Sequence, residues 1–246
     1  MKTTLRASWR DLFWIALPLL IWVFLIQTRG IWIKPYCNET PSHCTEKSVP
    51  WPDQISVHIE NSFANQLSFV TQNTSGAVAA TAVLLFHAAR VMGEAAVPTV
   101  LLAEAGVDLL LLGEVAIWNG ASLEVGRALV QRPRPFVYKD PEGLGENPSH
   151  YTSFYSGHTS FSASVLSLAL LILMFRKAGA RWVTSLSVIG STLVFSTALL
   201  RVLAGRHFIT DVLAGLIFGV LTAWIVFRVH LSKRQAAPNK MSPEQP

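Results

Sequence analysis

The sequence predicts an all-α fold, an integral membrane bundle of six transmembrane helices, and three observations support this class. Of the 246 residues, 51% are hydrophobic and only 14% are charged, whereas a soluble domain carries roughly 25% charged residues. The apolar residues are gathered in runs close to the ~20 residues that cross a bilayer core. The formal net charge is +5, but many of the Lys and Arg residues lie beside the apolar runs. They therefore indicate membrane topology and not a nucleic-acid-binding face.

The first apolar run covers residues 11–28. Basic residues precede it and no small-residue cleavage site follows it, so we expect a retained helix and not a cleaved signal peptide. Pro18 within this run predicts a kink. Five further runs, each expected to span the membrane, cover residues 74–89, 97–118, 158–175, 182–203 and 208–227. Residues 1–230 then form one membrane domain, and the Pro-, Gln- and Ser-containing residues 231–246 are expected to be a disordered cytoplasmic tail.

The polar segment 31–72 separates the first two runs, and we expect an extramembrane loop with a short amphipathic helix near residues 54–70. It contains the two cysteines of the chain, Cys37 and Cys44. A zinc site usually needs four ligands and closer pairs, which this segment does not supply. The two residues form either a disulfide in an oxidising compartment or two free thiols, and we expect the disulfide.

Six spans place both chain termini on the same side of the membrane. That side also receives Arg90 and the basic cluster of Arg176, Lys177 and Arg181, and an excess of Lys and Arg marks the cytoplasmic side. The opposite, exported side then receives three segments, residues 31–72, 119–157 and 204–206. The conspicuous polar motifs of the chain all lie at this exported end of the expected helices.

The first of these motifs places Arg127 and Arg134 seven residues apart, with Pro135 directly after the second. Guanidinium groups stay charged and donate paired hydrogen bonds to phosphate oxygens, so two of them suit a phosphate site. The prolines of this segment favour a helix followed by a turn. The alternative is a basic juxtamembrane segment that binds lipid head groups.

The second motif, Ser156-Gly157-His158, begins the fourth apolar run. A glycine allows close approach of the backbone to an anion, and a helix N-terminus adds amide donors and a favourable dipole. The hydroxyl of Ser156 can donate as well. His158 is placed to act as a general acid near neutral pH. The alternative is an ordinary helix cap followed by an interfacial histidine.

The third motif places His207 and Asp211 four residues apart, on one face of the last expected helix. With this spacing a carboxylate can hold one imidazole nitrogen while the other faces a substrate. Arg201 can supply a third phosphate contact across the preceding turn. The alternative is a surface salt bridge, which the apolar surroundings disfavour.

In this order and spacing, the three motifs resemble the signature of the type 2 phosphatidic acid phosphatase (PAP2) superfamily, over roughly residues 97–228. The resemblance implies that His207 is the nucleophile, Asp211 its partner and His158 the acid that protonates the leaving oxygen. It implies a phosphate-binding set formed by Arg127, Arg134, Arg201, Ser156 and Gly157. The chain departs from the common pattern at three positions, with Arg127 for lysine, Tyr155 for proline and Leu200 for serine, and none of these removes a catalytic group.

The resemblance further implies a metal-independent membrane lipid phosphatase that acts through a phosphohistidine and uses no cofactor. The expected substrates are phosphorylated lipids such as undecaprenyl pyrophosphate, phosphatidylglycerol phosphate, phosphatidic acid or the 1-phosphate of lipid A. Its expected partners are this substrate and membrane lipids, with no nucleic acid, and its expected place is the bacterial cytoplasmic membrane with the site facing the periplasm. The alternatives are a lipid phosphotransferase and a non-catalytic lipid binder or transporter. Such binders often lose the histidines, and both are present here.

The third apolar run contains three acidic residues, Glu104, Asp108 and Glu114. Ionisable groups within a membrane are costly and usually face the interior of the bundle. We expect these side chains to pair with His87 or Arg90, and the alternative is that they line a polar crevice.

Overall fold

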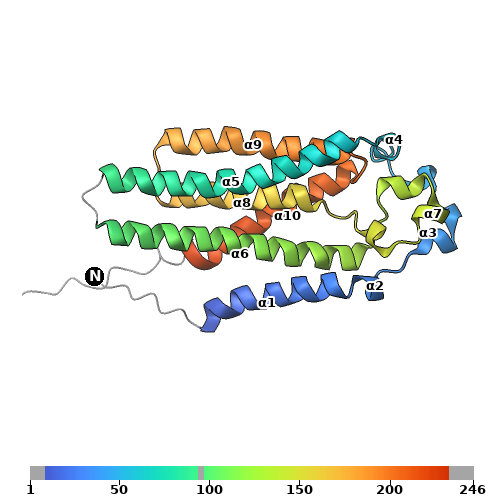
Figure 1. Ribbon diagram of the computed structural model, residues 1–246, viewed down its shortest axis with the longest axis horizontal. Coiled ribbons are helices and arrows are strands. Elements are labelled where there is room, and N and C mark those ends of the chain that lie inside the picture. Colours follow the sequence, from blue (N-terminus) through green and yellow to red (C-terminus); the bar gives the residue numbers. More distant parts are fainter. Residues whose placement is uncertain (1–8, 94–96, 233–246) are drawn as a thin grey trace, which may run out of the picture.

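The computed structural model describes residues 9–93 and 97–232, and six long helices run alongside one another through this part of the chain (Figure 1). They are α1 Trp9–Gln27, α5 Ser62–Gly93, α6 Pro98–Val130, α8 Gly157–Phe175, α9 Ala180–Leu203 and α10 Ile209–Phe227, which a π-helical turn extends over Arg228–Ser232. No β-strand occurs in the described residues. The expected all-α class is therefore confirmed, and each predicted apolar run lies mostly or wholly within one of the long helices.

Shorter helices gather at one end of this bundle and form a cap (Figure 1). They are α2 Arg29–Trp32, α3 Tyr36–Glu39, α4 Ile55–His58 and α7 Pro141–Leu144, with 3-10 turns at Pro41–His43, Glu46–Ser48, Pro135–Tyr138 and Pro148–Tyr151. Both cap segments, residues 28–61 and 131–156, connect long helices at the end of the bundle that holds the three motifs. We use the name cap for these two segments below.

Four described helices are long and apolar enough to cross a membrane, namely Ser62–Gly93, Gly157–Phe175, Ala180–Leu203 and Ile209–Leu231. The bent pair Phe13–Gln27 and Arg29–Glu39, with 63° between its two parts, would make a fifth span. These helices make the chain an integral membrane protein. Helix α6 packs against α1, α5 and α8 in the same bundle.

The expected loop over residues 31–72 is too long, because α5 already begins at Ser62. Residues 62–72 are rich in polar side chains, which is why their sequence does not resemble a membrane helix. In the structure Ser68 is fully buried and Asn65 and Ser68 both accept hydrogen bonds from Arg201. The expected amphipathic helix over 54–70 is likewise replaced by α4 and the first turns of α5.

Helix α8 lies at the centre of the bundle and contacts α5, α6, α9 and α10. Its approach to α10 is closest at two glycines. A Cβ atom on Gly215 would lie 2.7 Å from the carbonyl oxygen of Ser156, and one on Gly219 would lie 2.8 Å from Cβ of Ala163. Small residues four apart allow this contact between helix backbones, and it fixes the start of α8 against the start of α10.

The two cysteines form a disulfide in the structure, with Cα atoms 5.5 Å apart. Cys37 and Cys44 are buried and pack against Ile33, Val137 and Tyr151. The Tyr151 hydroxyl accepts a hydrogen bond from the backbone N–H of Cys37 at 2.8 Å. The disulfide loop is thereby attached to the second cap segment, which carries part of the candidate site.

Two of the three acidic residues that were expected to pair with His87 or Arg90 do so. Glu104 binds Arg90 at 2.8 Å and Asp108 binds His87 at 2.8 Å. Arg176 at the end of α8 donates to both carboxylates, at 3.0 Å to Glu104 and 2.8 Å to Asp108. This network lies at the end of the bundle opposite the cap (Figure 1). The expected partner was wrong for Glu114, which binds His230 at 2.8 Å and not His87 or Arg90.

Candidate active site

The first motif is a helix end followed by an extended segment, as its prolines predicted. Gln131 adopts a left-handed conformation with φ 45° and ends α6, and its backbone N–H donates to the carbonyl of Arg127. The chain then continues past Arg134, whose N–H donates to the carbonyl of His150 at 2.8 Å. This pairing holds the start of the second cap segment, which carries Arg134, against the later part of the same segment.

The three motif arginines form one cluster of positive charge. Arg134 lies within the electrostatic reach of Arg127, Arg201 and Arg206. Burial, and after it these neighbouring positive charges, together lower the pKa of Arg134 to about 9. The Nε atoms of Arg127, Arg134 and Arg201 are buried and have no hydrogen-bond partner. Unpaired buried donors on charged groups are costly, so this cluster fits a polyanion that would satisfy them.

Neutral polar side chains hold two of the three arginines. Nη1 of Arg201 donates to Asn65 at 2.8 Å and to Ser68 at 3.1 Å. Nη2 of Arg134 donates to the hydroxyl of Thr152 at 3.1 Å. These partners are neutral, so they orient the two guanidinium groups and leave the positive charge uncompensated.

Arg127 differs, because it has an acidic partner. Its Nη1 donates to Glu124 at 2.6 Å, and the other oxygen of the same carboxylate accepts from Arg29 at 2.7 Å. Glu124 is only 1% exposed. Sequence reasoning did not identify Glu124 or Arg29 as site residues, although the spacing of three between Glu124 and Arg127 is a signal for such a helical pair.

His207 is oriented by a backbone carbonyl. Its Nδ1 lies 2.7 Å from the carbonyl oxygen of Ser153. A carbonyl oxygen only accepts hydrogen bonds, so Nδ1 carries the proton and Nε2 of the neutral ring carries a free lone pair. The side chain is 1% exposed. The structure therefore holds the tautomer that a nucleophilic histidine needs.

The expected direct hydrogen bond from His207 to Asp211 is absent in this structure. Asp211 Oδ2 lies 3.8 Å from Nδ1 of His207, which is an ion-pair distance to a protonated ring but too long for a hydrogen bond. The carboxylate instead accepts from the Phe208 N–H at 3.0 Å and from Ser153 Oγ at 2.5 Å. Asp211 lies in the first turn of α10, where a carboxylate caps the free amide groups of its own helix.

The electrostatics around His207 favour a neutral ring. Burial lowers the pKa of His207 to about 3. The positive charges of Arg201 and Arg134 act in the same direction, and the Asp211 carboxylate acts against them. The ring is thus neutral, with its Nε2 lone pair available, throughout the physiological pH range.

His158 lies in the first turn of α8. It is within the electrostatic reach of His207 and of the three motif arginines. Its Nε2 is buried without a hydrogen-bond partner, and its ring contacts the edge of Phe69 with 4.4 Å between centroids. The second histidine of the motifs is therefore beside the first, with one nitrogen free for a further partner.

Ser156 and Gly157 occupy different parts of the site. The Ser156 hydroxyl is fully buried and shares a hydrogen bond with Thr159 at 3.0 Å; its donation to an anion stays a prediction. Gly157 begins α8 beside Arg127: a Cβ atom there would lie 3.4 Å from Nη2 of Arg127 and 2.8 Å from Cδ2 of Leu123. The glycine therefore allows the closest approach of α6 and the arginine to the start of α8.

A family model described as "PAP2 superfamily" matches residues 108–235, just over half of the chain, and this range contains all three motifs. The chain belongs to the PAP2 superfamily. It is similar to a solved structure described as the first transmembrane PAP2 type phosphatidylglycerolphosphate phosphatase from Bacillus subtilis. The identity is 18% and the TM-score 0.48, and the match covers 91% of this chain and 98% of that chain. Comparison with curated proteins gives no match.

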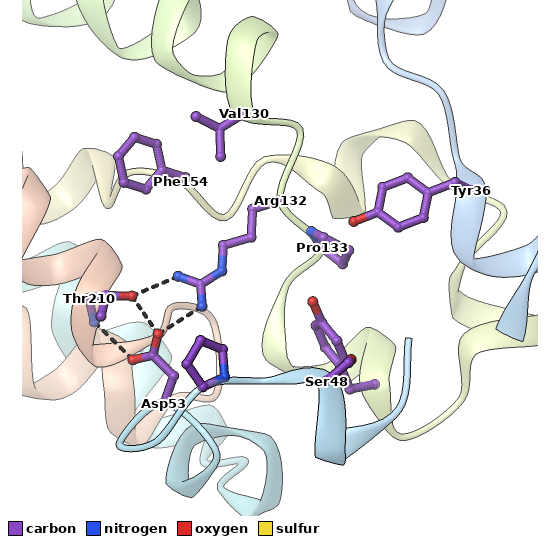
Figure 2. Close-up of a pocket in the computed structure, with 10 residues that line it drawn as sticks. Tyr36, Ser48, Asp53, Val130, Arg132, Pro133, Phe154 and Thr210 are labelled. Atoms are coloured by element: carbon purple, nitrogen blue, oxygen red, sulfur yellow. Dashed lines mark hydrogen bonds and ion pairs between the residues drawn. The ribbon is translucent and has the colours of Figure 1, made fainter. Parts of the chain in front are cut away.

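This PAP2 chain has a further charged group that the motif analysis missed. Arg132 lies between the two arginines of the first motif, and its Nη1 donates to Asp211 at 2.7 Å. Its Nη2 donates to Asp53 of the first cap segment at 2.7 Å. Figure 2 shows this arginine reaching toward Asp53 and Thr210. No sequence signal identifies Asp53, because it lies far from the motifs along the chain.

An open pocket of about 480 Å³ lies beside this group, between the two cap segments (Figure 2). Its wall includes Val130 at the end of α6, Thr210 of α10 and the cap residues Tyr36, Ser48, Pro50, Asp53, Arg132, Pro133, Tyr138 and Phe154. Burial raises the pKa of Tyr138 to about 12, so its hydroxyl is protonated and uncharged. Within the described residues, no group of three His, Cys, Asp or Glu side chains is arranged to hold a metal ion.

Proposed function

We propose that this PAP2 protein is a metal-independent lipid phosphatase that hydrolyses a phosphate monoester or pyrophosphate of a membrane lipid through a phosphohistidine. The observation that carries the proposal is the arrangement around His207. A neutral ring with its Nδ1 proton fixed by Ser153 lies next to three arginines whose Nε donors have no partner. A nucleophile and a cluster of positive charge are thereby combined in one buried place.

The arginine cluster suits the phosphoryl group in its transition state. Phosphoryl transfer spreads negative charge over three peripheral oxygens, and catalysis rests mostly on positioning and on matching that charge. Arg134 and Arg201 have only neutral partners, so their charge is available to the substrate. The first turn of α8, which begins at Gly157, adds amide donors and the positive end of a helix dipole. This charge supplies the role that a divalent metal has in many phosphoryl-transfer enzymes.

In the first step, Nε2 of His207 attacks phosphorus, a P–N bond forms and the bond from phosphorus to the lipid oxygen breaks. His158 donates its proton to the departing oxygen, so the products are a phosphohistidine and a lipid alcohol or lipid monophosphate. Asp211 lies at 3.8 Å from Nδ1 and stabilises the positive charge that the ring gains in this step.

In the second step, water attacks the phosphohistidine and His158 accepts a proton from that water. The P–N bond breaks, inorganic phosphate leaves, and His207 regains its neutral form. A lipid hydroxyl in place of water would give a phosphotransferase, which is the alternative that product analysis separates. A non-catalytic binder would leave the ester intact.

The site is proposed to face the exported side of the membrane. The six proposed spans are the four apolar helices, the bent pair of α1 with the segment after it, and α6. The support is the disulfide in the cap, which forms in oxidising compartments, and the basic residues Arg176, Lys177 and Arg181 at the opposite end of the bundle. A periplasmic site in a bacterial cytoplasmic membrane would act on head groups in the outer leaflet. The outward-facing Phe69, 48% exposed beside His158, fits contact with the lipid chains.

The proposal is tested with purified protein in detergent micelles. Phosphate release is measured from phosphatidic acid, phosphatidylglycerol phosphate, undecaprenyl pyrophosphate and lipid A 1-phosphate, with EDTA present. We expect release from at least one of these lipids and none with the His207→Ala variant. Transfer of labelled phosphate to an added acceptor lipid without release would show the phosphotransferase. Binding of these lipids without turnover would show a binder and contradict the proposal.

A further inference from the structure

Arg132 contacts the site through both its backbone and its side chain. Its backbone carbonyl accepts a hydrogen bond from the Ser153 N–H at 3.0 Å. Its Nη1 donates to Asp211 at 2.7 Å and also to the Thr210 hydroxyl at 2.7 Å. One residue thus holds both Ser153 and Asp211, the two neighbours that contact the Nδ1 side of His207.

Ser153 connects this contact to the reactive ring. Its hydroxyl donates to Asp211 at 2.5 Å, and its carbonyl accepts the Nδ1 proton of His207 at 2.7 Å. The position of the ring therefore depends on Ser153, and the position of Ser153 depends on Arg132 and Asp211. The path from Arg132 to His207 contains only hydrogen bonds of ordinary length and buried groups.

The other half of the guanidinium is attached to the cap. Nη2 of Arg132 donates to Asp53 at 2.7 Å, and Asp53 also accepts the N–H of Thr210 at 3.0 Å and the hydroxyl of Thr210. The side chains of Asp53 and Asp211 are 1% and 0% exposed. Two buried carboxylates thus face one guanidinium, which separates them and compensates their charge.

The shape of the guanidinium is used as well as its charge. Its Cζ atom lies over the ring of Phe208, 3.9 Å from the ring centroid. The guanidinium donates in two directions at once, toward Asp211 and toward Asp53, and Figure 2 shows the contact with Asp53. A lysine carries the same charge, but as a single point on a flexible stem, and it cannot reproduce a fixed fork that also stacks on an aromatic ring.

We infer that Arg132 is a positioning residue for the nucleophilic His207, acting through Asp211 and Ser153, with Asp53 of the cap as its anchor. The inference rests on the proposed phosphatase activity. Arg132 itself does not belong to the cluster of unpartnered arginines, because both of its Nη atoms are bound to carboxylates. Its loss should therefore slow the chemical step and change substrate binding little.

The pocket beside Arg132 makes a chemical-rescue experiment possible. Arg132 and Asp53 both line this open space of about 480 Å³, so a free guanidinium ion can reach the place that Arg132→Ala vacates. Wild type, Arg132→Ala, Arg132→Lys and the control Arg181→Ala are compared on dioctanoyl phosphatidic acid or whichever lipid wild type hydrolyses. Arg181 is exposed at the start of α9, far from the cap, so its variant controls for the loss of one arginine.

We expect kcat of Arg132→Ala to fall about 100-fold, the size of effect that a small misplacement of a catalytic group produces, with KM changed less than about 3-fold. Guanidinium chloride at on the order of 10 mM, far below denaturing concentrations, should restore kcat at least about 10-fold in this variant only. Arg132→Lys should retain intermediate kcat. Folding is checked for every variant by thermal unfolding in detergent.

Two results would overturn the inference while the wild type remains active. A folded Arg132→Ala with wild-type kcat would show that the contact is dispensable. A loss of kcat that neither guanidinium nor lysine restores in any degree would show a purely structural role. An inactive wild type on every lipid tested would instead contradict the proposed function, so the two failures are distinguishable.

Discussion

The carbonyl oxygen of Ser153 lies 2.7 Å from Nδ1 of His207, whereas the Asp211 carboxylate lies 3.8 Å from the same atom. The backbone of the cap, and not a side chain of α10, therefore selects the tautomer of the reactive ring. Asp211 supports this arrangement indirectly, because its carboxylate accepts a hydrogen bond from the Ser153 hydroxyl.

This geometry predicts a modest effect for Asp211→Asn. Where a carboxylate directly fixes the histidine tautomer, the corresponding Asn variant loses about 10⁴-fold in kcat. Here the Ser153 carbonyl remains in place, so we expect kcat to fall only about 10- to 100-fold. Steady-state kinetics on the hydrolysed lipid give the measurement. A fall of about 10⁴-fold in a folded variant would show that the ring uses Asp211 directly during turnover.

His207→Ala is predicted to abolish covalent catalysis. Rapid quenching of wild type with ³²P-labelled lipid should trap a phosphoenzyme that is labile in acid and stable in alkali, as expected for a P–N bond. The variant should trap none and lose at least about 10⁴-fold in kcat, since the nucleophile is removed. His43→Ala, at an exposed position in the cap, is the control and should trap label as wild type does. Equal trapping in His207→Ala would assign the nucleophile elsewhere.

Arg134→Gln is predicted to change the pH dependence of kcat/KM, whose acid limb reports the free enzyme. Burial and the nearby arginines lower the pKa of His207 to about 3. Because only the neutral ring attacks, the acid limb of wild type should lie at a pH far below the pKa of an ordinary histidine, about 6.5. Removing a positive charge favours the protonated ring and raises this pKa. The acid limb should therefore move to higher pH in the variant and stay in place in Arg181→Gln. A limb that stays in place in Arg134→Gln would show that Arg134 does not act on the ring.

Glu124→Gln is predicted to disturb substrate binding and stability together. The buried carboxylate holds Arg127 at 2.6 Å and Arg29 at 2.7 Å, and its removal leaves two positive charges facing each other. Breaking a buried pair in this way costs about 3–5 kcal/mol. We expect a lower Tm and a KM raised about 10-fold, because Arg127 loses its fixed orientation. Glu142→Gln, exposed in the cap, should change neither quantity.

The long helices could be predicted from the sequence because apolar runs of sufficient length have few other solutions in a membrane. The start of α5 could not, since Asn65 and Ser68 are polar residues whose partner, Arg201, is more than 130 residues away along the chain. The motif spacing likewise predicted the clustered arginines and both histidines. It did not predict Arg132, whose role depends on Asp53 in a different cap segment, or the capping geometry that directs Asp211 to Ser153.

The sidedness of the protein is predicted from its two ends. The cap carries the disulfide of Cys37 and Cys44, and the opposite end carries the exposed Lys177. Because the native cysteines are oxidised and buried, cysteines introduced at Glu142 in the cap and at Lys177 can be labelled selectively with an impermeant maleimide on right-side-out vesicles. We expect Glu142→Cys to react from outside and Lys177→Cys to react only after the membrane is permeabilised. The positive-inside distribution of Lys and Arg and the disulfide both predict this result. Labelling of Lys177→Cys alone in intact vesicles would invert the topology and place the phosphatase reaction in the cytoplasm.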